Sequence, residues 1–275
     1  MEYTKVEIEY KRPDDFYIYP IGDIHAGSIH CAEDEIRRKV DEIRKQKNAL
    51  WIGMGDYADC ITSNDKRWSS YGLAEWVLED DIIDSQRSWL KKLFNPIKGK
   101  CIGLLTGNHE ETIHDRHQDA ITRHLCEDLE VPFLGYSCFV DLHFSRINSS
   151  SRTLVQIHAF HGAGAAASDG GKLMRLMRLV NDIQADIYLM GHLHDIVVKS
   201  PHRLRCVNGR VKSIPLVAAI TGSWMRAYTQ PKKNEMMGIS YAEKKGYVPN
   251  RIGCPVIKIH PEPDQVTREM IKIES

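Results

Sequence analysis

Five short apolar segments of the chain each end at a polar cluster that contains Asp, Asn or His. The clusters are GDIH (22–25), GDYAD (55–59), GNHE (107–110), FHG (160–162) and GHLH (191–194). The apolar segments before them have the length of β-strands. In an α/β sheet, the loops beyond the strand ends meet at one edge, where ligands bind. The sequence therefore predicts that these five clusters form one site.

Segments with helical spacing alternate with the apolar runs. We expect strands over 16–21, 48–54, 101–105, 153–160 and 186–190, an extended segment over 131–144, and further strands after 195. Helices are expected over 32–46, 73–94, 112–129 and 172–183, the last capped by Ser168 or Asp169. This alternation predicts an α/β protein. Because no repeat and no Pro- or Ser-rich linker interrupts it, we expect a single domain over 1–275.

The composition narrows the environment in which this protein works. Hydrophobic residues make up 42% and charged residues 27%, which is typical of a soluble globular protein. The 37 basic and 37 acidic residues cancel, which argues against a sequence-independent nucleic-acid binder. No apolar run is long enough for a membrane span, and the N-terminus lacks the apolar core of a secretory signal. Seven scattered cysteines without a CxxC pair indicate reduced thiols, so we predict a cytoplasmic protein with no membrane partner.

The residue types in the five clusters indicate a metal site. Each cluster alone is compatible with ordinary turn chemistry, but five in succession are not. Imidazole nitrogens beside carboxylates favour transition metals over Mg²⁺ or Ca²⁺. None of the five clusters contains a cysteine, which argues against a structural zinc site. A shared carboxylate can hold two metals roughly 3.5–4 Å apart, the spacing used for displacement at phosphorus. We expect two divalent ions, Mn²⁺ first, with Fe, Zn²⁺ or Ni²⁺ as alternatives.

The five clusters, in this order and spacing, resemble the signature of the calcineurin-like metallophosphoesterases. The similar region extends over about residues 15–195. The resemblance implies a fold in which two mixed β-sheets pack as a sandwich flanked by helices, with a dimetal site at the strand ends. It also implies ligands for each ion. Asp23, His25 and His194 would hold the first metal, Asp56 would bridge, and Asn108, His161 and His192 would hold the second.

The same resemblance assigns His109 and Asp59 to catalysis. His109 matches the histidine that contacts the phosphate and protonates the leaving oxygen. Asp59 matches the acidic partner that would orient and charge this imidazole. Two histidines compete for one ligand position, because His158 lies three residues before His161. We favour His161, which Gly162 follows directly as in the family pattern.

Two positions depart from the pattern of the protein phosphatases in this family. Those enzymes carry an arginine directly after GDxxD and another before GNHE, and this chain has Cys60 and Thr106 there. Neither side chain can replace the bidentate contact that a guanidinium makes with phosphate. Activity on phosphoproteins is therefore disfavoured.

Residues 222–253 form a possible substrate-facing loop region. Between 224 and 251 there are six Lys or Arg residues against two Glu, interleaved with Trp224, Tyr228, Tyr241 and Tyr247. Such a mixture suits a phosphate backbone with stacked bases, although a solvated loop explains it equally well. We predict a dimetal phosphodiesterase or nuclease that acts on nucleic acid (DNA or RNA) or nucleotides. A phosphomonoesterase and a non-catalytic scaffold of the same fold are the alternatives, and a homo-oligomer is possible.

Overall fold

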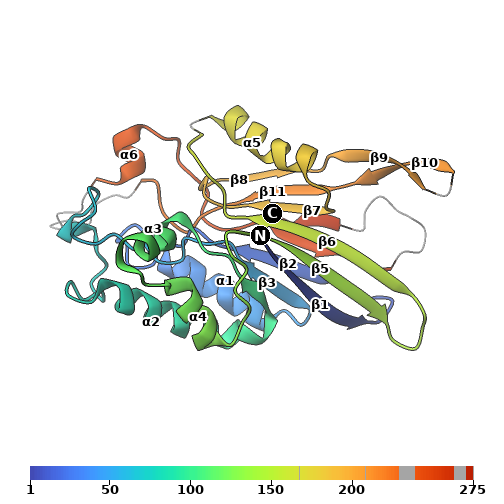
Figure 1. Ribbon diagram of the computed structural model, residues 1–275, viewed down its shortest axis with the longest axis horizontal. Helices are drawn as coiled ribbons and strands as arrows, with labels where there is room; N and C mark the ends of the chain where they lie inside the picture. Colours follow the sequence, from blue (N-terminus) through green and yellow to red (C-terminus); the bar gives the residue numbers. More distant parts are fainter. Residues whose placement is uncertain (167, 208, 229–238, 263–270, 275) are drawn as a thin grey trace.

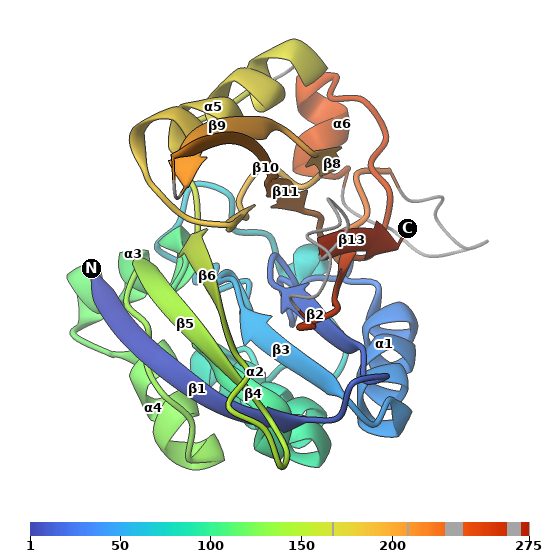
Figure 2. The ribbon, with the colours of Figure 1, turned by 90° about the vertical axis from the view of Figure 1, so that its right-hand side faces the viewer.

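Two mixed β-sheets lie at the centre of the computed structural model, and helices pack on their outer faces (Figures 1 and 2). The structure describes residues 1–275 except 167, 208, 229–238, 263–270 and 275. The first sheet has the strand order β1 (Glu2–Tyr10), β5 (Ser137–Arg146), β6 (Arg152–Phe160), β7 (Ile187–Met190), β11 (Val217–Thr221) and β8 (Ile196–Lys199). The second has the order β13 (Ile271–Glu274), β12 (Val256–Ile259), β2 (Phe16–Ile21), β3 (Ala49–Gly53) and β4 (Cys101–Leu104). A hairpin of β9 (His202–Val207) and β10 (Arg210–Pro215) projects separately.

Three apolar layers hold these elements together. The central layer lies between the sheets and includes Ile52 of β3 and Val140 of β5. A second layer joins the outer face of the β2–β3–β4 sheet to three helices, α1 (Glu33–Lys45), α2 (Ile82–Phe94) and α4 (Ile121–Leu129). The third lies under α5 (Asp169–Asp182). The predicted fold class, α/β with two mixed sheets packed as a sandwich and flanked by helices, is confirmed.

The remaining helices are short. They are α3 (Asn108–His117), α6 (Tyr241–Lys245) and the 3-10 turns η1 (Ser70–Gly72) and η2 (Asn95–Lys100). Among the residues described, no helix has the length and apolar character needed to cross a bilayer. The side chain of Ser168 caps α5 by accepting a hydrogen bond from the Gly171 N–H at 3.2 Å, which is one of the two caps expected.

Two expected helices differ from the structure for tertiary reasons. The helix expected over 73–94 begins only at Ile82, because Leu73 and Ala74 pair with the segment after the first cluster, where the Ala74 N–H donates to the Gly27 carbonyl. The helix expected over 112–129 is two helices. The chain leaves the helical conformation at Gln118, whose φ of 57° ends α3. Residues 73–81 and 118–120 are therefore loops.

Candidate metal centre

The five polar clusters meet at the ends of strands from both sheets. Strands β2, β3 and β4 run parallel to one another, as do β6 and β7, so the loops after them open at a common edge. All the predicted metal ligands except Asn108 belong to three mutually adjacent groups. These groups are Asp23, His25 and His194; His25, Asp56 and His109; and Asp56, His161 and His192. In each group the ligand atoms lie within 4.8 Å of one another.

An uncommon backbone conformation marks the same residues. In the part of the chain that the structure describes, nine non-glycine residues have positive φ, and five of them are predicted ligands: Asp23, His25, Asp56, His192 and His194. The left-handed region costs free energy for residues with a side chain, although Asp and His tolerate it better than most. Such residues gather at functional sites when the surrounding structure holds them there. The clustering of this strain independently marks the strand ends as the functional site.

The first group brings two imidazoles and a carboxylate to one point. The Nε2 atoms of His25 and His194 are 3.1 Å apart, and His194 Nε2 lies 3.3 Å from Asp23 Oδ1. Asp23 and His25 are buried, whereas the side chain of His194 is 34% exposed. The site is therefore open to solvent beside His194.

The group of Asp56, His161 and His192 lies beside the amide of Asn108, the remaining predicted ligand. His161 donates Nδ1–H to the Met54 carbonyl at 2.7 Å, which turns Nε2 toward the site. This Nε2 lies 3.1 Å from Asn108 Oδ1 and 3.4 Å from Asp56 Oδ2. His192 contributes a buried Nδ1 that has no hydrogen-bond partner among the described residues. The side chains of Asn108, Asp56 and His161 therefore converge beside an unpartnered nitrogen of His192. A bound cation would satisfy these atoms, so the residues fit a metal.

The electrostatics of this pocket also favour cations. Burial alone would raise the pKa of Asp56, but His161 and His109 beside it lower that pKa well below its usual value. Burial by itself would lower the pKa of His161, and the Asp56 charge raises it. Without a metal, the pair is therefore held as an ion pair. A metal ion bound at His161 would replace its proton, so metal binding and proton release are linked.

His109 and Asp59 are in contact, but not in the way the resemblance implied. The Asp59 carboxylate lies 3.2 Å from Nδ1 of His25, so it orients a predicted metal ligand. His109 Nδ1 instead faces the backbone carbonyl of Asp59 at 2.5 Å. The expected carboxylate–His109 pair is absent among these described residues, because the chain turns at Cys60 (φ 55°) and its carbonyl at Asp59 occupies that place. Since a carbonyl only accepts, His109 carries its proton on Nδ1 in this structure.

The competing histidine lies outside the site. His158 is on β6 in the apolar layer under α5, where its ring packs edge-on against Phe139 at 5.1 Å. Both of its ring nitrogens are buried without a partner among the described residues. It is absent from the three ligand groups, whereas His161 belongs to one of them.

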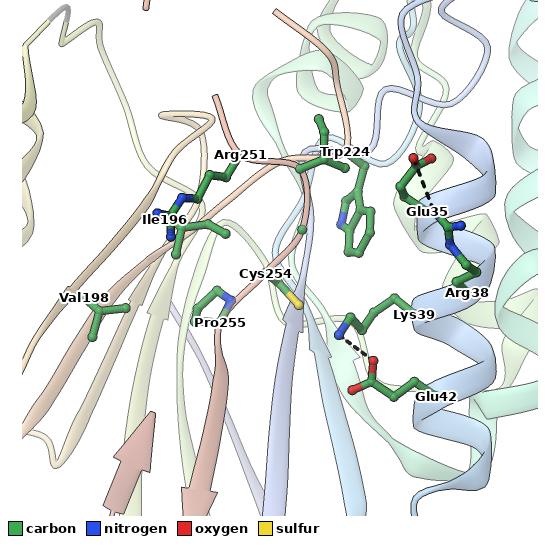
Figure 3. A pocket seen from close by; sticks show the side chains of 12 residues that line it. Glu35, Arg38, Lys39, Glu42, Ile196, Val198, Trp224, Arg251, Cys254 and Pro255 are labelled. Carbon is green, nitrogen blue, oxygen red and sulfur yellow. Dashed lines mark hydrogen bonds and ion pairs between the residues drawn. The ribbon is translucent and has the colours of Figure 1, made fainter. Parts of the chain in front are cut away.

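The predicted loop region 222–253 begins directly behind Asp23. The Trp224 N–H and the Ser223 hydroxyl both donate to the Asp23 carbonyl, at 2.9 and 2.8 Å. Arg226 is bound to Glu35 at 3.0 Å, so its charge is already paired. The Trp224 indole ring lines a cavity of about 410 Å³ beside α1, and none of the predicted ligands is among the residues that line this cavity (Figure 3). Lys232 and Lys233 of this region lie outside the described residues.

Sequence reasoning missed two residues that the structure places at the site, Glu110 and Arg67. The buried Glu110 carboxylate accepts backbone N–H groups from Asp56, Tyr57, Ala58 and Gly107, at 2.7–3.1 Å. It joins the loop that carries Asp56 to the loop that carries Asn108. In the sequence it looks like an ordinary acid in the first turn of a helix. Arg67 comes from the loop before η1, and its Nη1 lies 3.2 Å from His109 Nε2.

Replacing Glu110 with alanine is expected to lower the free energy of unfolding by about 3–5 kcal/mol, because four buried backbone donors lose their acceptor. Urea unfolding measures the change. Metal content should fall as well, since the loops that hold Asp56 and Asn108 are no longer joined. The neighbouring Glu111→Ala is the control and should unfold like the wild type. Equal midpoints for Glu110→Ala and wild type would contradict this role.

Comparison with known proteins bears on the same residues. The sequence model of the calcineurin-like phosphoesterases matches residues 16–195, well over half of the chain. No curated protein matches the chain. Proteins of this family hydrolyse phosphoesters with two divalent metal ions, and all three ligand groups lie within the matched residues. The chain therefore belongs to the calcineurin-like phosphoesterase family.

Proposed function

We propose that this protein hydrolyses phosphodiesters of nucleic acids or nucleotides with two divalent transition-metal ions, Mn²⁺ first. One observation carries the proposal. The Asp56 carboxylate belongs both to a group with His25 and to a group with His161 and His192, so one side chain reaches both halves of the site. A shared carboxylate of this kind suits a dinuclear centre. The seven free cysteines support a reducing compartment, and we assign the protein to the cytoplasm.

The proposed division of labour follows from the contacts. Asp23, His25 and His194 would hold one ion, Asn108, His161 and His192 would hold the other, and Asp56 would be shared between them. When bound, the metals supply an activated water and neutralise phosphate oxygens. His25 donates its Nδ1–H to the Asp59 carboxylate, and His161 donates its Nδ1–H to the Met54 carbonyl, which fixes the tautomers so that each Nε2 faces the site. His109, 8% exposed, would then donate a proton to the leaving oxygen.

The preference for diesters rests on the positions where protein phosphatases carry arginine. Cys60 and Thr106 are buried, and Thr106 accepts a hydrogen bond from Thr122, so neither can grip a phosphate. A dianionic monoester gains most from two guanidinium groups. A diester carries one negative charge and loses less when they are missing.

A metal-exchange activity panel tests this proposal. Metal-stripped protein is loaded with Mn²⁺, Fe²⁺, Zn²⁺, Ni²⁺ or Mg²⁺ and assayed on bis-p-nitrophenyl phosphate, p-nitrophenyl phosphate, DNA, RNA and cyclic nucleotides. We expect faster turnover with Mn²⁺ than with Mg²⁺, because Mg²⁺ binds imidazole poorly. We also expect diesters to be hydrolysed faster than the monoester.

Two outcomes of the panel would change the proposal. Equal rates with Mn²⁺ and Mg²⁺ would contradict ligation by four histidines. Faster turnover of p-nitrophenyl phosphate than of every diester would make the protein a phosphomonoesterase. Absence of turnover on every substrate, with two metals bound, would favour the non-catalytic scaffold.

A further inference from the structure

Arg67 is held in a fixed orientation at the edge of the metal centre. Its Nε and Nη2 donate to the two carboxylate oxygens of Asp65, at 3.0 and 2.9 Å. The Arg67 backbone N–H donates to the same carboxylate at 2.8 Å. This pairing lowers the pKa of Asp65 to about 2, so the carboxylate stays charged at any working pH. The planar guanidinium is thereby oriented before any ligand arrives.

The free edge of this guanidinium points into the site. Nη1 lies 3.2 Å from Nε2 of His109, the nitrogen that faces away from the Asp59 carbonyl. Arginine has five N–H groups, and three of them are engaged by Asp65 and His109. The other two have no partner among the described residues, and the side chain is 40% exposed. Arg67 can therefore bind an anion that enters from solvent.

The position of Arg67 beside His109 places the guanidinium next to the metal centre. His109 forms a candidate ligand group with His25 and Asp56, and Nη1 of Arg67 lies 3.2 Å from its Nε2. A substrate phosphate brings nonbridging oxygens to this place. Guanidinium–phosphate hydrogen bonds are among the strongest available to a protein side chain.

We propose that Arg67 binds a nonbridging oxygen of the substrate's phosphoryl group, and that Asp65 is the residue that positions it. This inference rests on the proposed function. The arginines missing at positions 60 and 106 are thus replaced in part by one that the loop between β3 and α2 carries to the site. A single guanidinium held on one side suits the single charge of a diester.

The test compares Arg67→Ala, Arg67→Lys and Asp65→Asn with the wild type. Arg87→Ala is the matched control, because Arg87 also binds an aspartate, Asp84, through Nε and Nη2, and lies on α2 outside the ligand groups. Each protein is loaded with Mn²⁺, its metal content is measured, and hydrolysis of bis-p-nitrophenyl phosphate is followed. Binding of inorganic phosphate is measured by calorimetry as a readout that needs no turnover.

We expect Arg67→Ala to keep its metals, to lose roughly 10–100-fold in kcat/KM, and to bind inorganic phosphate more weakly by a similar factor. Arg67→Lys should recover only part of the loss, because an ammonium lacks the planar fork. Asp65→Asn should show a smaller loss of the same kind. Guanidinium chloride, far below unfolding concentrations, should restore part of the activity of Arg67→Ala but not of Asp65→Asn. Arg87→Ala should stay within about twofold of the wild type.

Three results would overturn the inference. Wild-type values of kcat/KM and of phosphate affinity in Arg67→Ala would remove Arg67 from substrate binding. Loss of metal in Arg67→Ala would make the residue a support of the metal centre. A loss of equal size in Arg87→Ala would make the effect nonspecific. Failure of the proposed function is distinguishable, since it appears as absent turnover in the wild type while calorimetry still compares phosphate binding.

Discussion

His109→Ala is expected to keep both metals and to lose roughly 10²–10⁴-fold in turnover of a diester with an alkyl leaving group. The imidazole is anchored by the Asp59 carbonyl through Nδ1, so Nε2 is the atom available to the substrate. Without it, the leaving alkoxide must depart without a proton. Arg67 loses the same contact, but its fork on Asp65 does not depend on His109.

The choice of leaving group distinguishes proton donation by His109 from other roles of this residue, such as metal binding. With p-nitrophenolate, which hardly needs a proton, the loss in His109→Ala should be much smaller. His124→Ala is the control, because that histidine is on α4 and pairs with Asp119 at 3.2 Å. Elemental analysis of His109→Ala tests whether His109 is a metal ligand instead, since it also forms a candidate ligand group with His25 and Asp56. Loss of metal would make it a ligand. Full activity on the alkyl diester would show that another group supplies the proton.

The gathering of the five clusters was predictable because it depends on topology alone. Parallel strands carry the residues at their ends to one edge of a sheet. GDIH and GHLH therefore meet although Asp23 and His192 lie 169 positions apart, and the His192 backbone N–H donates to the Asp23 carboxylate at 2.9 Å. The sandwich of two sheets was implied only by the resemblance. Strand periodicity cannot distinguish it from a single sheet, since both give buried apolar runs.

Helix boundaries were predicted less well, because tertiary contacts decided them. The spacing of apolar residues over 73–81 is compatible with a helix and equally with the observed loop. The pairing of Leu73 with Ser28 fixes the loop, and no local pattern reveals a partner 45 residues away in the sequence. The start of α3 at Asn108 likewise depends on Glu110, whose carboxylate accepts the Gly107 N–H.

The contacts of Glu110, Arg67 and Asp59 were beyond sequence reasoning for one shared reason. Each depends on which atom of a residue faces which neighbour, and that choice is made by loop geometry. Asp59 was expected to use its carboxylate on His109, and it uses its carbonyl. Arg67 lies in a loop whose residues carry no recognisable motif, so only its distance to His109 reveals it.

Asp56→Asn is expected to lose both metals and, with them, activity on every substrate. Asp56 is the residue common to two ligand groups, and its two oxygens are used differently: Oδ1 accepts the His109 N–H at 2.9 Å, and Oδ2 lies 3.4 Å from His161 Nε2. An asparagine can keep one of these interactions but turns a donor toward the other. It also removes the negative charge that offsets two cations in a buried pocket.

The size of this effect follows from a comparison with weaker changes. Losing a residue that only orients a metal ligand costs about 10–100-fold in metal affinity, so losing a ligand shared by two ions should cost more. Equilibrium dialysis followed by elemental analysis measures it, with Asp128→Asn as the control, because Asp128 only pairs with Lys91 and Arg87 at the surface. His194→Ala should lose mainly the first ion, since His194 belongs to one group alone. If Asp56→Asn retained two ions per chain, the carboxylate would not be shared, and the two halves of the site would have to bind metal independently.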